Sequence, residues 1–201
     1  MQSKLTEESQ CRENEFVEGL QFSPSSGVVL RGRFSEGPPK NWGAANRIGR
    51  WYKPCPTAMS SRFDKGRVRH DFLIPMEHLD EAMEVCEKEL EIYPLWLSPY
   101  NQPSCPGMIR QRSGRNVLFV NVGVYGRPGK PDVDPKIGIR RIEDFVRDVN
   151  GVSVVHNGTT MSRSEFWQMF DSSLYEWLRV KYNCKEAFLD VYDKVRSMAQ
   201  G

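Results

Sequence analysis

Hydrophobic and polar residues follow two different periods along this chain. A period of two, typical of strands, runs from Asn116 to Tyr125, where three valines share one face and Asn121 and Tyr125 share the other. The valine face suits a buried core. The face with the amide and the phenol is therefore our candidate for the working surface of the protein.

Further strands are predicted where β-branched and aromatic residues gather between turn-forming residues. They are Phe16–Ser23, Gly27–Phe34, Arg50–Lys53, Val68–Pro75, Pro94–Tyr100 and Val152–His156. The first two, joined by Pro-Ser-Ser-Gly, should form a hairpin. Pro99 cannot donate to a ladder, so we expect the strand that contains it to end there.

A period of 3.6 predicts the helices. They are Leu5–Arg12, Met76–Leu90, Ile139–Asn150, a helix that starts after Ser162, Leu174–Tyr182 and Phe188–Met198. Gly151 should close the third of them, and Ser162 with Glu165 forms a capping box. We also expect the spaced aromatic residues of the last helices to form a buried core, namely Trp167, Phe170, Tyr175 and Trp177.

The order strand–helix–strand–strand–helix–strand predicts an α+β fold, an antiparallel sheet of ferredoxin-like type with helices packed on one face. Residues 1–54 should form a first part that holds the hairpin. Residues 55–67 have no periodicity and are interpreted as a linker or a deletion junction. Residues 68–201 should form the main part with the C-terminal helices.

Composition and charge argue against several classes of function, among them nucleic-acid binding and metal binding. The net charge of +2 opposes a nucleic-acid partner. Five cysteines without a CxxC pair, and three histidines without metal-ligand spacing, favour neither a disulfide framework nor a zinc site, so no metal is expected. No run approaches the ~20 apolar residues of a membrane span, and the chain itself is expected to be soluble and cytosolic.

Single residues say less. The sequence has no GxGxxG, P-loop or GxSxG motif. Trp96 and Tyr100 are able to stack on a flat ring, but an aromatic residue on a strand belongs to a core more often than to a site. Glu18 interrupts an apolar run and should pair with Arg31 on the adjacent strand.

Several strings resemble the Diminuto family of Δ24-sterol reductases. They are FVEGL, WYKP, YPLWLSPYNQPSCPGM, NVGVYG, IEDFVRDVNG and EFWQMFDSSLYEWLRVKYNCKEAFLDVYDKV. The likeness covers nearly the whole chain, in order, and concerns only the C-terminal portion of that family. Long strings with spaced Trp and Tyr residues make it a specific signal.

The resemblance implies a flavoprotein of the vanillyl-alcohol-oxidase type, with a membrane anchor, an FAD-binding domain and a cap domain. In this family NADPH supplies hydride through FAD to saturate a sterol side-chain double bond, at the endoplasmic reticulum membrane. This chain is similar to the cap, so the flavin-binding half would act in cis or in trans. Trp96, Tyr100, Asn121 and Tyr125 would then face flavin and sterol, and no catalytic residue is assigned.

Two departures from the family are visible. Asn121 stands where members usually carry Asp, and Cys55 to Arg67 replaces a long segment rich in His, Arg and Tyr. One hypothesis is the cap domain of a sterol reductase, as a fragment that is inactive alone. The alternative is a non-catalytic remnant or splice product that binds a sterol or a protein partner without turnover.

Overall fold

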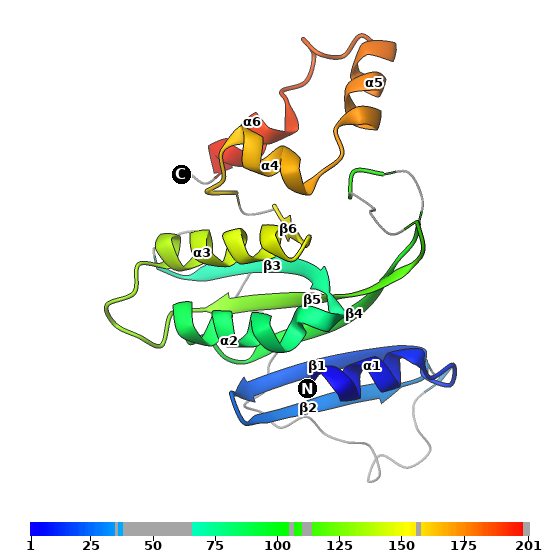
Figure 1. The fold of residues 1–201 in the computed structure, drawn as a ribbon, viewed down its shortest axis with the longest axis vertical. Helices are drawn as coiled ribbons and strands as arrows, with labels where there is room; N and C mark the ends of the chain where they lie inside the picture. The colour runs from blue at the N-terminus through cyan, green and yellow to red at the C-terminus, as the bar shows by residue number, and fades with distance from the viewer. Residues whose placement is uncertain (35, 38–65, 105–106, 110–113, 156–157, 199–201) are drawn as a thin grey trace.

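The structure, a computed structural model, describes residues 1–34, 36–37, 66–104, 107–109, 114–155 and 158–198 (Figure 1). Six strands form one antiparallel sheet in the order β2-β1-β4-β5-β3-β6. They are β1 (Phe16–Ser23), β2 (Ser26–Gly32), β3 (Val68–Pro75), β4 (Leu95–Gln102), β5 (Val117–Gly126) and β6 (Val152–Val154). The expected α+β fold is confirmed.

The last four strands have the order of a split βαβ layer. Strands β3 and β5 lie in the centre, with β4 and β6 outside them, and the two crossovers each contain a helix. The predicted hairpin of β1 and β2 is also confirmed, and it extends the sheet beyond β4.

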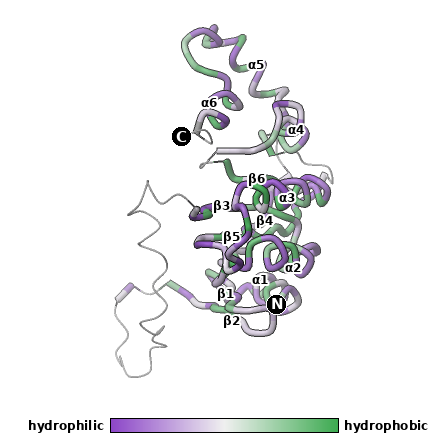
Figure 2. The backbone as a smooth tube through the Cα atoms, turned by 90° about the vertical axis from the view of Figure 1, so that its left-hand side faces the viewer, coloured by the Kyte–Doolittle hydropathy of each residue, from purple (hydrophilic) through white to green (hydrophobic). Residues whose placement is uncertain are grey.

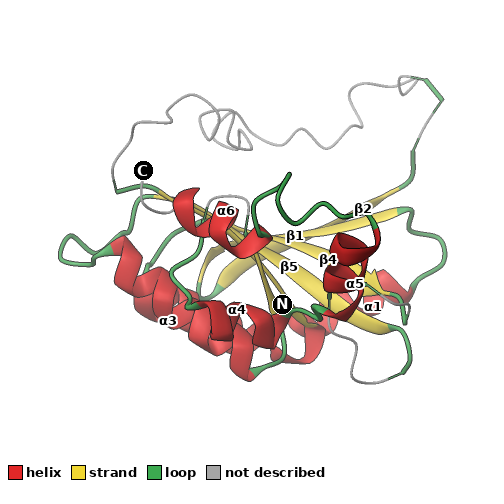
Figure 3. Ribbon diagram, turned by 90° about the horizontal axis from the view of Figure 1, so that it is seen from above, coloured by secondary structure: helices red, strands yellow, loops and turns green. Residues whose placement is uncertain are grey.

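Helices of the first three-quarters of the chain cover one face of this sheet (Figures 2 and 3). They are α1 (Gln2–Gln10), a short 3-10 helix (Met76–His78), α2 (Leu79–Glu89) and α3 (Pro135–Asp148). Three more helices lie beyond edge strand β6 (Figure 1). They are α4 (Arg163–Met169), α5 (Ser173–Lys181) and α6 (Val191–Met198). We call the opposite face of the sheet the helix-free face, since no helix of the described residues packs on it.

The core lies between the sheet and helices α1 to α3. Val120, Val122 and Val124 are buried there, as the period of two predicts. Side chains of α2 and α3 close the core from the other side, among them Leu79 and Ile142. Burial of this continuous apolar layer supplies most of the driving force for folding.

Strand β4 continues past Pro99, so the predicted end was wrong. Pro99 lies opposite Val120, and the ladder with β5 runs on to Gln102. The pairing with β1 involves only Leu95 to Leu97. Beyond Leu97 the strand has one partner in the described ladders, which is where a residue without an N–H donor is tolerated.

Helix α3 differs from the prediction at both ends. It starts at Pro135, four residues early, because the Asp134 side chain caps it by accepting from the Lys136 amide. At its end Asn150, with φ of 57°, takes the left-handed position that was expected of Gly151. Gly151 serves instead for close approach, since a Cβ there would lie 2.8 Å from the Leu73 carbonyl oxygen.

The predicted aromatic core of the C-terminal helices was right in part. Phe170 is buried, while Trp177 is 55% exposed. The centre of this cluster is Phe166, whose ring lies 4.7 Å from Phe170 and 5.6 Å from Tyr192 between centroids. Sequence periodicity alone did not show which aromatic residues turn inward.

The expected Glu18–Arg31 pair was also wrong. Arg31 lies opposite Val17 and bonds to Glu8 of α1 at 2.8 Å, whereas Glu18 lies opposite Leu30. Because successive side chains of a strand alternate between faces, a shift of one residue separates the two groups.

Some expectations concern residues outside the described ranges. These are the strand Arg50–Lys53, His156 and residues 55–65 of the proposed junction. Within the described part of the chain, no helix is both long and apolar enough to cross a membrane.

Candidate functional site

A cluster of polar side chains lies on the helix-free face at the centre of the sheet. Asp71 of β3 accepts hydrogen bonds from the Asn121 amide at 3.0 Å and from the Tyr125 hydroxyl, both on β5. Asp71 itself is buried, and the two donors are half-buried. The structure therefore brings together the two predicted residues and adds a carboxylate that fixes their orientation.

Gly123 makes this arrangement possible. It lies directly opposite Asp71 in the ladder of β3 and β5. A Cβ at this position would stand 2.6 Å from the Tyr125 ring and 3.2 Å from an Asp71 carboxylate oxygen. Only glycine leaves the room in which the Tyr125 ring crosses the strand to reach Asp71.

The two predicted aromatic residues lie on the same face at different distances from this cluster. Trp96 lies opposite Gly123 and is half-buried, whereas Tyr100 lies opposite Phe119 near the end of β4 and is exposed. The indole nitrogen of Trp96 is buried and has no hydrogen-bond partner among the described residues. A buried N–H without an acceptor is costly, and because neighbouring atoms cover this nitrogen, a ligand acceptor would reach it only after those atoms move.

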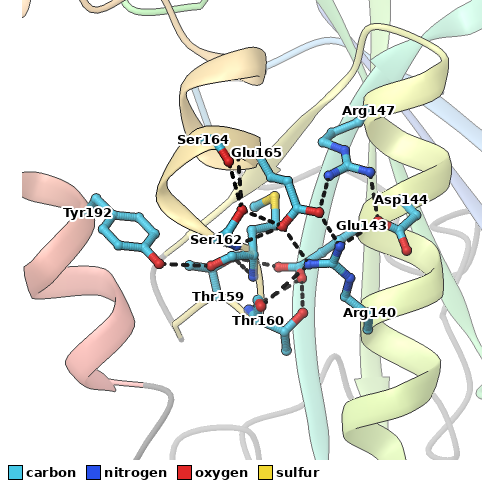
Figure 4. A network of polar contacts seen from close by, with 11 residues as sticks. Arg140, Glu143, Asp144, Arg147, Thr159, Thr160, Ser162, Ser164, Glu165 and Tyr192 are labelled. Atoms are coloured by element: carbon cyan, nitrogen blue, oxygen red, sulfur yellow. Dashed lines mark hydrogen bonds and ion pairs between the residues drawn. The ribbon is translucent and has the colours of Figure 1, made fainter.

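A second polar cluster joins the sheet to the C-terminal helices (Figure 4). At its centre is Glu143 of α3, which is fully buried. Its carboxylate accepts from the Thr159 hydroxyl at 2.9 Å, from the Thr160 amide at 3.3 Å and from the Thr160 hydroxyl. Burial raises the pKa of this carboxyl, although the threonine hydrogen bonds oppose the shift.

Ion pairs surround this buried carboxylate. Arg140 and Arg147 of α3 both contact Glu165, which also forms the predicted capping box with Ser162 (Figure 4). The Arg140 guanidinium holds the pKa of Glu165 well below its usual range. The Tyr192 hydroxyl of α6 donates to the Met161 carbonyl at 3.0 Å. These contacts connect α4 to α3, and they connect α6 to the loop that precedes α4.

An open pocket of about 420 Å³ lies beside this second cluster. It is lined by Arg140, Thr159, Thr160, Met161, Ser162, Glu165 and Arg196. Its arginine and carboxylate groups already bond to one another or to neighbouring residues, as Arg196 does to the Tyr192 hydroxyl at 2.8 Å. We therefore assign the second cluster a structural role, and we take the helix-free face as the candidate site.

Chemically, the centre of the helix-free face combines the Asp71 carboxylate, the Asn121 amide and the Tyr125 phenol with the Trp96 indole, whose N–H has no acceptor among the described residues. Such a surface suits a largely apolar ligand that is oriented by a few polar contacts. Among the described residues, no group of three His, Cys, Asp or Glu side chains is placed to hold a metal ion.

Sequence reasoning missed Asp71 and Glu143, and both had left a signal. Asp71 interrupts the apolar strand sequence VRHDFLIP. Glu143 lies next to Ile142 and three residues before Val146, within the apolar stripe of its helix. An acidic residue at a position where the period predicts burial needs a partner, and that partner is what only the fold identifies.

Comparison with known proteins finds relatives of one kind. A Delta(24)-sterol reductase homolog of Caenorhabditis elegans is 30% identical over 264 residues, covering 97% of this chain and 50% of the relative. The Delta(24)-sterol reductase of Homo sapiens is 28% identical and covers 98% of this chain and 51% of its own length. That of Arabidopsis thaliana is 23% identical, over 90% and 47%. No family model and no solved structure matches.

The chain spans about half the length of the curated relatives it matches. The alignment with the nematode protein also runs over more positions than the 201 residues of this chain. Some positions of the relative therefore have no counterpart in this chain within the matched region.

Proposed function

This chain belongs to the Delta(24)-sterol reductase family, and from that premise we propose that it is the substrate-binding cap domain of such an enzyme. Acting alone it is inactive, because reduction requires the flavin-binding half in the same polypeptide or in trans. The sterol lies on the helix-free face. The observation that carries this assignment is the Asp71, Asn121 and Tyr125 cluster beside the unpartnered Trp96 N–H.

The helix-free face fits a ring system better than a whole dinucleotide. In this proposal Trp96, Asn121 and Tyr125 contact the ring system of FAD or of the sterol, while the sequence has no glycine-rich motif for the diphosphate. Hydride transfer from NADPH to the side-chain double bond is the chemistry that FAD supplies in this family. The residues of this chain bind and orient the sterol and keep water from it.

Asn121, which differs from the residue expected from the family resemblance, has a defined hydrogen-bond partner in the proposed site. Where the family usually carries Asp, this chain has an amide that donates to Asp71. Asp71 on the neighbouring strand thus supplies a carboxylate to this face. Within the proposed site, Asp71 acts as a positioning residue for Asn121 and Tyr125.

The first test is an absorbance spectrum and a thermal melt of the purified chain, alone and with FAD and a Δ24 sterol. We expect no bound flavin spectrum from the chain alone, and a rise in Tm of a few degrees with sterol. Trp96→Ala should reduce that rise, while Ile137→Ala, an exposed change on α3 on the other side of the sheet, should leave it unchanged.

Two results would contradict the proposal. A stoichiometric flavin spectrum from the chain alone would show that it holds the cofactor without the other half. The absence of both flavin and sterol effects would favour the alternative, a non-catalytic remnant of the family.

A further inference from the structure

Helix α5 and the turn after it expose a set of large apolar side chains. No residue of α5 is buried. The exposed fractions are 40% for Leu174, 55% for Trp177, 64% for Val180, 67% for Tyr182, 67% for Phe188 and 75% for Leu189. We call these six residues the α5 surface. Scattered apolar residues are common on protein surfaces, but six within one short segment mark an interaction site.

This segment has a defined conformation in spite of its exposure. The Arg179 guanidinium donates to the carbonyl oxygens of Phe188 at 2.8 Å and of Lys185 at 3.0 Å. The Tyr175 hydroxyl accepts from the Val191 amide at 3.0 Å. A helix of nine residues is marginal by itself in water, so these contacts hold the surface ready for a partner.

The charges beside the α5 surface favour a protein partner over an anionic membrane. Lys185 pairs with Glu176 at 3.3 Å, and Lys181 lies over the Trp177 ring. Residues 173–189 contain three basic and two acidic side chains, so the electrostatic attraction to anionic lipids is small. Exposed aromatic residues bordered by paired charges are typical of the centre and rim of a protein interface.

The comparisons indicate which protein that is. The relatives match nearly all of this chain with only half of their own length, so each carries about as much polypeptide again. We propose that the α5 surface docks against that other half. This inference rests on the proposed function, in which the other half binds the flavin.

The second polar cluster would fix the orientation of a docked partner relative to the sheet. Glu143, Arg140 and Arg147 of α3 hold the loop before α4 and the first turn of α4, and α3 packs on the sheet (Figure 4). Helices α4 to α6 lie beyond edge strand β6 (Figure 1). A partner bound to α5 is therefore held in a fixed position relative to the helix-free face.

The test is co-expression of this full chain, carrying an affinity tag, with the half of the Caenorhabditis elegans relative that it does not match. We expect the two polypeptides to purify together. Trp177→Asp combined with Phe188→Asp should lower the retained half at least tenfold. Ile137→Asp, which places the same charge at an exposed apolar position of α3, should leave it unchanged.

Four results would overturn the docking proposal. Two concern the complex itself: either none forms, or the double variant retains the other half as well as the original chain does. In the third, the chain alone sediments as a dimer and the double variant does not. In the fourth, the chain floats with phosphatidylcholine–phosphatidylserine vesicles and the double variant does not. The proposed function fails separately. A complex that depends on the α5 surface but does not reduce a Δ24 sterol with FAD and NADPH would support the docking and contradict the activity.

Discussion

At the scale of single residues, the helix-free face depends on the absence of a side chain as much as on the polar groups present. Tyr125 reaches Asp71 only because position 123 is glycine. The cluster is thus specified by one permissive residue on β5 and one carboxylate on β3. Neither residue stands out in the sequence alone. The register of β3 and β5 shows that Asp71 and Gly123 lie directly opposite each other.

We predict that Gly123→Ala destabilises the protein by about 1–3 kcal/mol, because the added methyl group meets the Tyr125 ring. Chemical denaturation would measure the change. In a Tyr125→Ala background the same substitution should cost much less, since the obstacle is gone. Gly37→Ala, in open space, is the control. Equal costs in both backgrounds would contradict the packing that we describe.

The buried carboxylate of Glu8 predicts a dependence on pH. Lys4 and then Arg31 lower the pKa of Glu8 from 4.5 to about 2. A carboxyl with a lowered folded-state pKa contributes stability that is complete above its unfolded pKa and is lost as the pH falls through the folded pKa. The chain should therefore lose stability between pH 4.5 and 2. Glu8→Gln should remove part of that loss.

Urea midpoints at pH 7, 4 and 3 would test this expectation, with Glu7→Gln on the exposed side of the same helix as the control. A pH profile of Glu8→Gln that runs parallel to that of the wild type would show that the Glu8 ion pairs contribute nothing to acid sensitivity.

At the scale of elements, the C-terminal helices divide into a buried and an exposed part. Helix α4 buries Phe166 and Met169, while α5 buries no residue. Both helices are amphipathic and aromatic in sequence, so their patterns predict the same thing. The difference arises because α4 packs its Phe166 ring on Tyr192 of α6, whereas α5 contacts these two helices through Tyr175 and turns Trp177 toward solvent.

This division predicts contrasting effects of two similar substitutions. Phe166→Ala should cost about 3–5 kcal/mol, because it empties the centre of the aromatic cluster. Trp177→Ala should change the free energy of unfolding by less than about 0.5 kcal/mol in the isolated chain. Denaturation curves would compare them. A large cost for Trp177→Ala would mean that α5 packs against this chain itself.

At the scale of the whole molecule, the sheet with its helices and the α4–α6 unit are joined through buried polar groups. Glu143 is the central one, and its three hydrogen bonds all go to Thr159 and Thr160. Such a network is stabilising only when every member is satisfied. The connection is consequently specific in orientation and sensitive to the loss of one group.

We predict that Glu143→Ala costs about 1–3 kcal/mol, since it leaves the buried Thr159 hydroxyl without its acceptor. The loss should be accompanied by faster amide exchange in residues 158–162. Asp148→Ala, which removes an exposed carboxylate near the end of the same helix, is the control. Unchanged exchange in the loop would show that the ion pairs of Glu165 suffice for the connection.

Much of this architecture was determined by the sequence itself. Alternation placed the valines of β5 in the core, helical periodicity located α2 and α3, and the capping box marked the start of α4. These features depend on neighbours within one element, which the local pattern encodes. Family membership also followed from sequence strings, since the relatives match nearly the whole chain.

Only the tertiary structure decided which groups meet across elements. It paired Arg31 with Glu8 instead of Glu18, brought Asp71 to Asn121 and Tyr125, and buried Glu143 beneath a threonine loop. It also left Trp177 exposed while burying Phe166. The reason is physical: register and packing are set by long-range contacts, and a shift of one residue moves a side chain to the opposite face of a strand.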